Sequence, residues 1–246
     1  ISVGCKPDGK NINKACGAMH AEAVAREVRK HHAQLGVALD GDADRLIVVD
    51  EKGQIVDGDA VMALCASRLL KEKKLPKATV VATVMSNMGL ERALKDMGGK
   101  LVRTGVGDRY VVEEMRRGGY RFGGEQSGHL IFLDHATTGD GVVAALQVMA
   151  VMVSEGRPLS ELAHLLERVP QVLESVKLPA RKPMEEMPLL TRLIAKTEKT
   201  LGERGRVLVR WSGTEPKLRV MLEGPNPDKL AQWAAEMIEA ARKDVS

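Results

Sequence analysis

Short apolar runs alternate with longer segments of helical spacing along the first two thirds of the chain. This alternation is typical of an α/β fold, in which a mixed, mostly parallel sheet is covered by helices on both faces. Expected strands lie at 1–4, 35–40, 78–84, 100–104, 120–125 and 129–134, with a hairpin at 45–56. Expected helices lie at 19–33, 57–72, 87–98, 107–119 and 139–156.

Local signals refine three of these elements. Lys52-Gly53 marks the turn of the hairpin, and Asp57 or Asp59 is expected to cap the helix that follows it. The short connection within residues 120–133 predicts one antiparallel strand pair in an otherwise parallel sheet.

After Pro158 the pattern changes to strand, helix, strand, strand, helix. This order predicts a small α+β domain at the C-terminus, with an open antiparallel sheet and helices on one face. The expected elements lie at 171–178, 189–202, 206–213, 217–224 and 227–243.

Composition narrows the function classes. A length of 246 residues allows one to three domains, and 44% hydrophobic with 28% charged residues is ordinary for a globular protein. No apolar run reaches the roughly 18 residues of a membrane helix, so no membrane partner is expected. A net charge of +4 suits small anionic ligands, while 2% aromatic residues leave little to stack on nucleic-acid bases. Nucleic acid is therefore not an expected partner.

The N-terminus and the cysteines point to the setting of the protein. The chain begins in an apolar, β-branched run without Met or a signal-peptide layout, as if cut within a strand. Cys5, Cys16 and Cys65 are few, odd in number and without metal-ligand spacing, so a reducing, cytoplasmic location is expected.

Three aspartates, Asp40, Asp42 and Asp44, occupy alternate positions in "LDGDADR". On an extended backbone they project to one side, where three carboxylates suit Mg²⁺. A solvated acidic turn is the plain alternative. An EF-hand loop is excluded because Arg45 replaces the required Gly and strands flank the motif. A phosphatase with an aspartate nucleophile needs neither the third aspartate nor Arg45.

A glycine-rich stretch, "GGEQSGHL" at 123–130, carries a second set of polar residues. Glu125, Ser127 and His129 alternate, so they are expected to share one face and bind sugar hydroxyls. The alternative is a polar hairpin end.

Two further stretches suit anions. In "VRWSGTEPKLRV" (209–220), a tight turn lies between Arg210 and Arg219, whose guanidinium groups match phosphate. The turn residues are Ser212, Gly213 and Thr214. An exposed hairpin with ordinary surface arginines is the alternative.

In "RTGVGDRYVVEEM" (103–115), glycines precede a helix that Asp108 is expected to cap. Arg109 would then point at a ligand. A plain capped helix explains the same letters.

Together and in this order, the motifs resemble those of the α-D-phosphohexomutase superfamily. The matching stretches are "DGKNINKACG", "LDGDADR", "TGVGDRYVVEEM", "GGEQSGH", "TTGDG" and "SGTEPKLRVMLEG". The resemblance implies an enzyme in which a phosphoserine gives its phosphate to a sugar phosphate. The resulting bisphosphate turns around and returns its other phosphate.

Within the superfamily, "GEQSGH" and "DGKNIN" resemble the members that act on amino sugars, and this resemblance implies the conversion of glucosamine 6-phosphate to glucosamine 1-phosphate. A phosphomannomutase or phosphoglucomutase is the alternative enzyme. A non-catalytic module that binds phosphosugar or metal is the alternative outside enzymes.

The resemblance also implies roles for individual residues. Asp40, Asp42 and Asp44 would bind Mg²⁺, and Asp108 and Arg109 are the candidate catalytic residues. The implied substrate-binding residues are Arg45, Glu125, Ser127, His129, Arg210, Ser212, Gly213, Thr214 and Arg219. The last five would hold the phosphate that is not reacting. The chain departs from many relatives at Gly105, where they carry Lys, and from some at Asp108, where they carry His.

The superfamily's phosphoserine lies in a first domain, in a loop of Ser, His, Asn and Pro, and no such loop occurs in this sequence. We therefore expect the chain to be the later part of a mutase whose partner is a missing N-terminal phosphoserine domain. Residues 1–56 would end domain two, 57–166 form domain three and 167–246 form the phosphate-binding domain. A homodimer is one assembly that the chain could form.

Overall fold

The computed structural model describes residues 1–213 and 215–245 and divides the chain into two compact units, Ile1–Glu167 and Arg168–Ser246. Each unit has a hydrophobic core of its own. Thr214, one of the expected phosphate-binding residues, lies outside the described residues.

A four-stranded sheet forms the centre of the first unit, in the order β5-β4-β6-β7. Strands β5, β4 and β6 are parallel and β7 is antiparallel to β6, which confirms the expected mixed sheet. The strands are β4 (Thr79–Thr83), β5 (Lys100–Thr104), β6 (Phe122–Gly124) and β7 (Leu130–Phe132).

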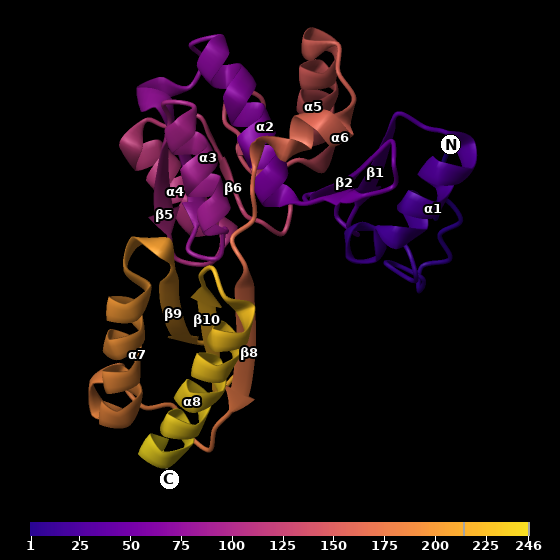
Figure 1. Cartoon of the computed structure of the whole chain (residues 1–246). Coiled ribbons are helices and arrows are strands. Elements are labelled where there is room, and N and C mark those ends of the chain that lie inside the picture. Colours follow the sequence, from indigo (N-terminus) through magenta and orange to yellow (C-terminus); the bar gives the residue numbers. More distant parts are fainter. Residues whose placement is uncertain (214, 246) are drawn as a thin grey trace. The chain divides into compact units, whose positions relative to one another are not determined.

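Helices cover both faces of this sheet (Figure 1). Alternate residues of β4 explain the arrangement. Val80 and Ala82 belong to the core that contains the buried sides of α2 and α3, whereas Val81 belongs to the cluster of α4. The helices are α2 (Gly58–Lys71), α3 (Met88–Asp96) and α4 (Asp108–Gly118). Asp57 caps α2 by accepting the N–H of Ala60 at 3.1 Å.

The connections reverse direction between β4 and β6. Helix α3 leads from β4 to β5 on one side, and α4 leads from β5 back across to β6 on the other. In open parallel sheets, ligands bind beyond the carboxyl ends of strands at such a reversal. The loops at 105–107 and 125–129 begin at these carboxyl ends.

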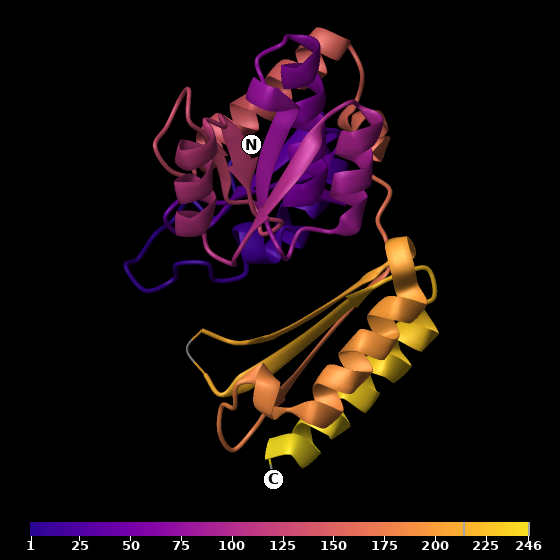
Figure 2. The ribbon, with the colours of Figure 1, turned by 90° about the vertical axis from the view of Figure 1, so that its left-hand side faces the viewer.

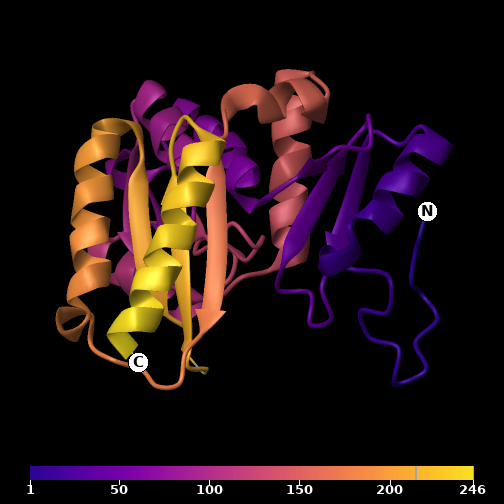
Figure 3. The same ribbon diagram turned by 60° about the horizontal axis from the view of Figure 1, so that its bottom comes forward.

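A second, antiparallel sheet of the first unit has the order β1-β2-β3. Its strands are β1 (Leu35–Leu39), β2 (Leu46–Asp50) and β3 (Ile55–Val56). Helix α1 (Glu22–His31) packs on it through Ala25 and Val28 against Val49. Helix α5 (Gly141–Glu155) lies between this sheet and the parallel one (Figure 3).

The strand expected at Ile1–Gly4 is wrong. Residues 1–17 form turns and irregular backbone, and Gly4 has a φ of +69°. An apolar, β-branched run makes a strand only when a neighbouring strand takes up its hydrogen bonds, and this segment pairs with none of the described strands.

The second unit has the expected order of elements and an antiparallel sheet, β8-β10-β9. Its two long helices lie on the same face of the sheet (Figure 2). The elements are β8 (Gln171–Lys177), α7 (Pro188–Leu201), β9 (Arg206–Trp211), β10 (Lys217–Glu223) and α8 (Pro227–Val245).

Short helical turns complete the described chain, at Ala18–His20, Pro76–Ala78, Leu159–Leu162 (α6), Ala163–Leu165, Met184–Glu186 and Gly202–Arg204. Within the described residues, no single helix is long and apolar enough to cross a membrane. Two successive helical segments are long and apolar enough only when they are taken together, and they are bent by 94° at the break between them. They are Gly141–Glu155 and Leu159–Leu165.

Candidate metal and phosphosugar site

The three aspartates lie in the loop that connects β1 to β2. The extended backbone expected there is wrong, because residues 41–43 form a turn and Ala43 has a φ of 60°. The turn still gathers the carboxylates of Asp40, Asp42 and Asp44, whose nearest oxygens all lie within 4.8 Å of one another. Convergence therefore comes from folding the loop over, not from strand alternation.

Arg45 closes this metal loop, defined as residues 40–45. Its backbone N–H donates to Asp40 Oδ1 at 3.1 Å, and its Nε lies 3.5 Å from Asp40 Oδ2. About half of the Arg45 side chain stays exposed. The guanidinium therefore remains accessible to an anionic ligand beside the carboxylates.

The charge state of the loop favours a bound cation. Partial burial raises the pKa of Asp44, His129 opposes this rise, and the carboxylates of Asp40 and Asp42 reinforce it. Asp44 Oδ1 is buried and has no hydrogen-bond partner. A divalent cation that prefers oxygen ligands, such as Mg²⁺, would offset the repulsion among the carboxylates and would bind the buried oxygen that lacks a hydrogen bond. These residues therefore fit the metal.

The sugar loop, residues 125–129, connects β6 to β7 as a tight turn. Its backbone turns instead of running extended: Glu125 N–H donates to the His129 carbonyl and Gly128 N–H to the Glu125 carbonyl, both at 3.0 Å. A shared face for Glu125, Ser127 and His129 therefore does not follow from strand alternation. Gly128 has a φ of +94°, and a Cβ there would lie 2.0 Å from the carbonyl oxygen of Leu46. Only glycine allows this loop to approach β2 so closely.

His129 brings the metal loop and the sugar loop together. Its side chain is only 4% exposed, and its Nδ1 lies 3.1 Å from Asp44 Oδ2. On the other side of the ring, the N–H of Gly139 donates to Nε2 at 3.2 Å. Asp108 Oδ2 is 3.9 Å from the same nitrogen.

Glu125 contacts the start of α4. Its Oε1 accepts the N–H of Gly107 at 3.2 Å. Asp108 does not cap the helix as expected, because Gly107 occupies the cap position, with a φ of 130°, and Asp108 is already the first helical residue. The carboxylate of Asp108 is thereby left half-exposed near His129.

The remaining residues of this region lie on the surface. Ser127 is exposed at the tip of the sugar loop. Arg109 is 80% exposed and pairs along its own helix with Glu113 at 2.8 Å. The hydrogen bond to Glu113 raises the pKa of Arg109. The structure thus brings Asp108 to His129, whereas Arg109 is engaged on α4.

The phosphate loop of the second unit connects β9 to β10. Arg210 and Arg219 are direct cross-strand partners. Burial, together with the charge of Arg219, lowers the pKa of Arg210. Ser212 is buried, with its N–H donated to the Lys217 carbonyl at 2.7 Å, and Gly213 is exposed. Two like charges side by side favour an anion between or above them.

One residue of the phosphate loop region was missed by the sequence reasoning. Arg181 Nη2 donates to the carbonyls of Ser212, Gly213 and Glu215 at 2.6, 2.9 and 2.8 Å. No local pattern indicates this contact, because it joins residues 31 or more positions apart. The motif "TTGDG" likewise carries part of the resemblance, but its sequence alone assigns no role to Gly139.

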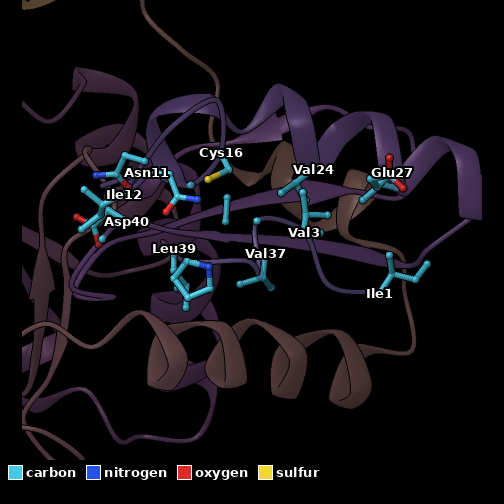
Figure 4. Close-up of a pocket in the computed structure, with 18 of the residues that line it drawn as sticks. Ile1, Val3, Asn11, Ile12, Cys16, Val24, Glu27, Val37, Leu39 and Asp40 are labelled. Carbon is cyan, nitrogen blue, oxygen red and sulfur yellow. The ribbon is translucent and has the colours of Figure 1, made fainter. Parts of the chain in front are cut away.

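A cavity of about 790 Å³ lies elsewhere, along the unpaired edge of β1. Figure 4 shows Ile1 and Glu27 at one end and Asn11, Ile12 and Asp40 at the other. Its lining is mostly apolar and touches the metal loop only at Asp40 and Gly41. It is therefore distinct from the polar site around His129.

An α/β unit with a carboxylate loop beside the carboxyl ends of parallel strands, followed by an α+β unit with paired arginines, is the arrangement that the resemblance to the phosphohexomutases implies. Three sequence models match the chain. They are phosphoglucomutase/phosphomannomutase alpha/beta/alpha domain II at 1–53, alpha/beta/alpha domain III at 57–169 and the C-terminal domain at 149–240. The chain belongs to the phosphoglucomutase/phosphomannomutase family.

Two similar relatives are bacterial phosphoglucosamine mutases. The one from Sorangium cellulosum (strain So ce56) is 62% identical over all 246 residues, which is 51% of its own length. The one from Myxococcus xanthus (strain DK1622) is 58% identical over the whole chain, or 54% of its length. The chain thus spans about half the length of these curated relatives.

Solved structures support the fold. Aspergillus fumigatus N-acetylphosphoglucosamine mutase, in complex with GlcNAc-6P and magnesium, matches with a TM-score of 0.74 at 22% identity. The match covers 95% of this chain and 54% of that one.

Proposed function

We propose that the protein containing this chain is a phosphoglucosamine mutase, which interconverts glucosamine 6-phosphate and glucosamine 1-phosphate. The observation that carries the proposal is the meeting of the metal loop and the sugar loop, 3.1 Å apart at Asp44 and His129. The 62% identity to a phosphoglucosamine mutase along the whole chain supports the amino sugar as substrate.

Asp40, Asp42 and Asp44 of the metal loop would hold Mg²⁺. When bound, the metal would supply positive charge beside the phosphoryl group in transfer. Arg45 keeps Asp40 in place and offers its exposed guanidinium to a phosphate oxygen.

The sugar loop binds hydroxyls through Glu125 and Ser127. In the second unit, Arg210 and Arg219, with the loop residues Ser212, Gly213 and Thr214, bind the phosphate that is not reacting. A clamp for the sugar and a separate site for the second phosphate let the substrate bind in either of two orientations.

The chemistry is a phosphoryl exchange in two steps. We assign the phosphoserine to the half of the protein outside this chain. A sugar hydroxyl attacks its phosphorus, the P–O bond to the serine breaks, and the serine hydroxyl becomes free. The hydroxyl proton passes to a base, for which Asp108 is the candidate, and Arg109 stands next to it. The serine hydroxyl then attacks the other phosphate of the bisphosphate, the P–O bond between that phosphate and the sugar breaks, and the departing sugar oxygen takes up a proton from the catalytic acid as the serine gives one up. This restores the phosphoserine and releases the sugar monophosphate product.

The proposal places the protein in the cytoplasm, where sugar phosphates are made and where its three free cysteines stay reduced. A homodimer is the assembly to test first by light scattering.

The test measures turnover by the whole protein with Mg²⁺ and a catalytic amount of the sugar bisphosphate. Glucosamine 6-phosphate is compared with glucose 1-phosphate and mannose 1-phosphate, and a variant with all three aspartates changed to Asn is the control. We expect the highest kcat/KM for the amino sugar. Preference for glucose or mannose would make the protein a phosphoglucomutase or phosphomannomutase. Binding of all three without turnover would make it a non-catalytic phosphosugar module.

A further inference from the structure

We propose that His129 is a positioning residue for the metal site. It holds Oδ2 of Asp44 by a hydrogen bond, so that Oδ1 is the oxygen that faces the metal. Gly139 fixes the ring for this purpose. The inference rests on the proposed function only in taking Asp44 as a metal ligand.

The hydrogen bonds around His129 assign its tautomer. The N–H of Gly139 can only donate, so Nε2, at 3.2 Å, is the acceptor. In the neutral ring the proton therefore sits on Nδ1, which lies 3.1 Å from Asp44 Oδ2 and donates to it. With 4% of the side chain exposed, solvent competes little for either bond.

The two oxygens of Asp44 therefore have different surroundings. Oδ2 accepts the hydrogen bond of His129, while Oδ1 is buried, has no hydrogen-bond partner and lies 3.9 Å from Arg45 Nε. A buried carboxylate oxygen without a hydrogen bond is costly, and a metal ion bound directly to it would offset this cost more fully than a guanidinium at 3.9 Å. By holding Oδ2, His129 leaves Oδ1 as the oxygen that we assign to the cluster with Asp40 and Asp42, whose ligand oxygens lie within 4.8 Å of one another.

The segment "TTGDG", residues 137–141, supports this arrangement from both sides. A Cβ on Gly139 would lie 2.3 Å from His129 Nε2, so only glycine leaves room for the ring. Gly141 donates its N–H to the Ala43 carbonyl of the metal loop at 2.9 Å. A Cβ on Gly141 would lie 2.9 Å from the carbonyls of both Ala43 and Arg45. Both glycines of this motif are thus explained by contacts with the metal site.

Asp108 does not orient the ring in this structure. Its Oδ2 lies 3.9 Å from Nε2, beyond hydrogen-bond distance. A role of His129 through Nε2, toward Asp108 or a substrate, is the competing explanation.

Two amide variants separate these explanations. In His129→Asn, the side-chain NH₂ is bonded to Cγ, as Nδ1 is in histidine, and it retains a donor for Asp44. In His129→Gln, the NH₂ is one atom further out, like Nε2, and no donor reaches Asp44. The probe is Mn²⁺, titrated into the 246-residue chain and followed by electron paramagnetic resonance. His164→Gln, an exposed histidine on the same unit, is the matched control.

We expect His129→Gln to bind Mn²⁺ about 10-fold or more weakly than the parent chain, the lower end for loss of a group that orients a metal ligand. His129→Asn should stay within about threefold of the parent, a difference well below that loss. Equal losses in both variants, or a loss confined to Asn, would overturn the inference.

A spectroscopic measurement covers the case in which a variant does not fold. The ¹⁵N spectrum of the parent chain should show His129 protonated at Nδ1 and not at Nε2, and the opposite tautomer would also overturn the inference. If the parent chain binds Mn²⁺ no better than Asp44→Asn, Asp44 is not a metal ligand, and both the proposed metal site and this inference are disproved. This result differs from a failure of the inference alone, because it is seen without any substitution at His129.

Discussion

Two arginines face each other across neighbouring strands of the C-terminal unit, and this pairing makes Arg219 testable. Arg219 is half-buried within β10, not exposed at a turn, and its buried Nε has no hydrogen-bond partner. We predict that Arg219→Ala weakens binding of glucosamine 1-phosphate by about 1.5–3 kcal/mol, the usual scale for a hydrogen bond to a charged group. Isothermal titration measures the change, with the exposed Arg192→Ala on α7 as control.

Stability should respond differently at the same residue. Removing one of two facing positive charges relieves repulsion with Arg210, so the free energy of unfolding should fall by less than about 1 kcal/mol. Unchanged phosphate affinity, or affinity lost only because the variant unfolds, would remove Arg219 from the phosphate site.

At the scale of elements, a single guanidinium organises the phosphate loop. Arg181 donates to three carbonyls of the loop, at Ser212, Gly213 and Glu215, and so holds the backbone of the loop in place. We predict that Arg181→Gln speeds amide exchange of Ser212 and weakens phosphate binding by about 1–2 kcal/mol, because the loop loses the hydrogen bonds that order it. Hydrogen exchange by NMR, with Arg192→Gln as control, reads the loop directly. Exchange that matches the parent chain would leave Arg181 without this role.

A carboxylate ties the β2–β3 hairpin to α6. Partial burial would raise the pKa of Glu51, but hydrogen bonds from the hydroxyl and N–H of Ser160 outweigh it and leave the pKa lowered. A lowered folded pKa means stability that is present above the ordinary value of 4.5 and is lost as the pH falls through the folded value. We predict that Glu51→Gln costs about 1 kcal/mol at pH 7 and nothing once the pH has fallen below that folded value.

Urea unfolding followed by circular dichroism measures this difference in the free energy of unfolding. Tryptophan fluorescence would not report on Glu51, because both tryptophans, Trp211 and Trp233, lie in the other unit. The exposed Glu167→Gln is the control. A cost that persists at low pH would assign the effect to packing instead of charge.

The contrast between elements and contacts explains what the sequence could reveal. Period and turn chemistry located β4, α5 and the whole C-terminal unit, since those signals are local. The strand at 1–4 failed because pairing is not local, and the cap at Asp108 failed because the helix begins one residue earlier than expected, with Gly107 at the cap position. Likewise, the letters gave the three aspartates but not the turn that gathers them.

At the scale of the whole molecule, the serines decide what the chain can do alone. Phosphoryl exchange needs a nucleophile that carries the phosphate between turnovers. None of the described serines lies in a loop of Ser, His, Asn and Pro, and Ser86 and Ser160 are buried. Metal, sugar and phosphate sites lower the barrier only of a reaction whose attacking group is present.

We therefore predict that the 246-residue chain folds and binds phosphosugar but does not convert glucosamine 6-phosphate. Each unit has its own hydrophobic core, so we expect the chain to fold without the phosphoserine domain. The purified chain is assayed with Mg²⁺ and a catalytic amount of the bisphosphate, beside the chain with Asp40, Asp42 and Asp44 changed to Asn. Adding a separate, serine-phosphorylated N-terminal domain should restore some turnover if the two pieces associate. Conversion by the unaided chain above the triple variant would mean that it contains a phosphate-carrying nucleophile of its own, and Ser127, exposed in the sugar loop, would be the first residue to replace.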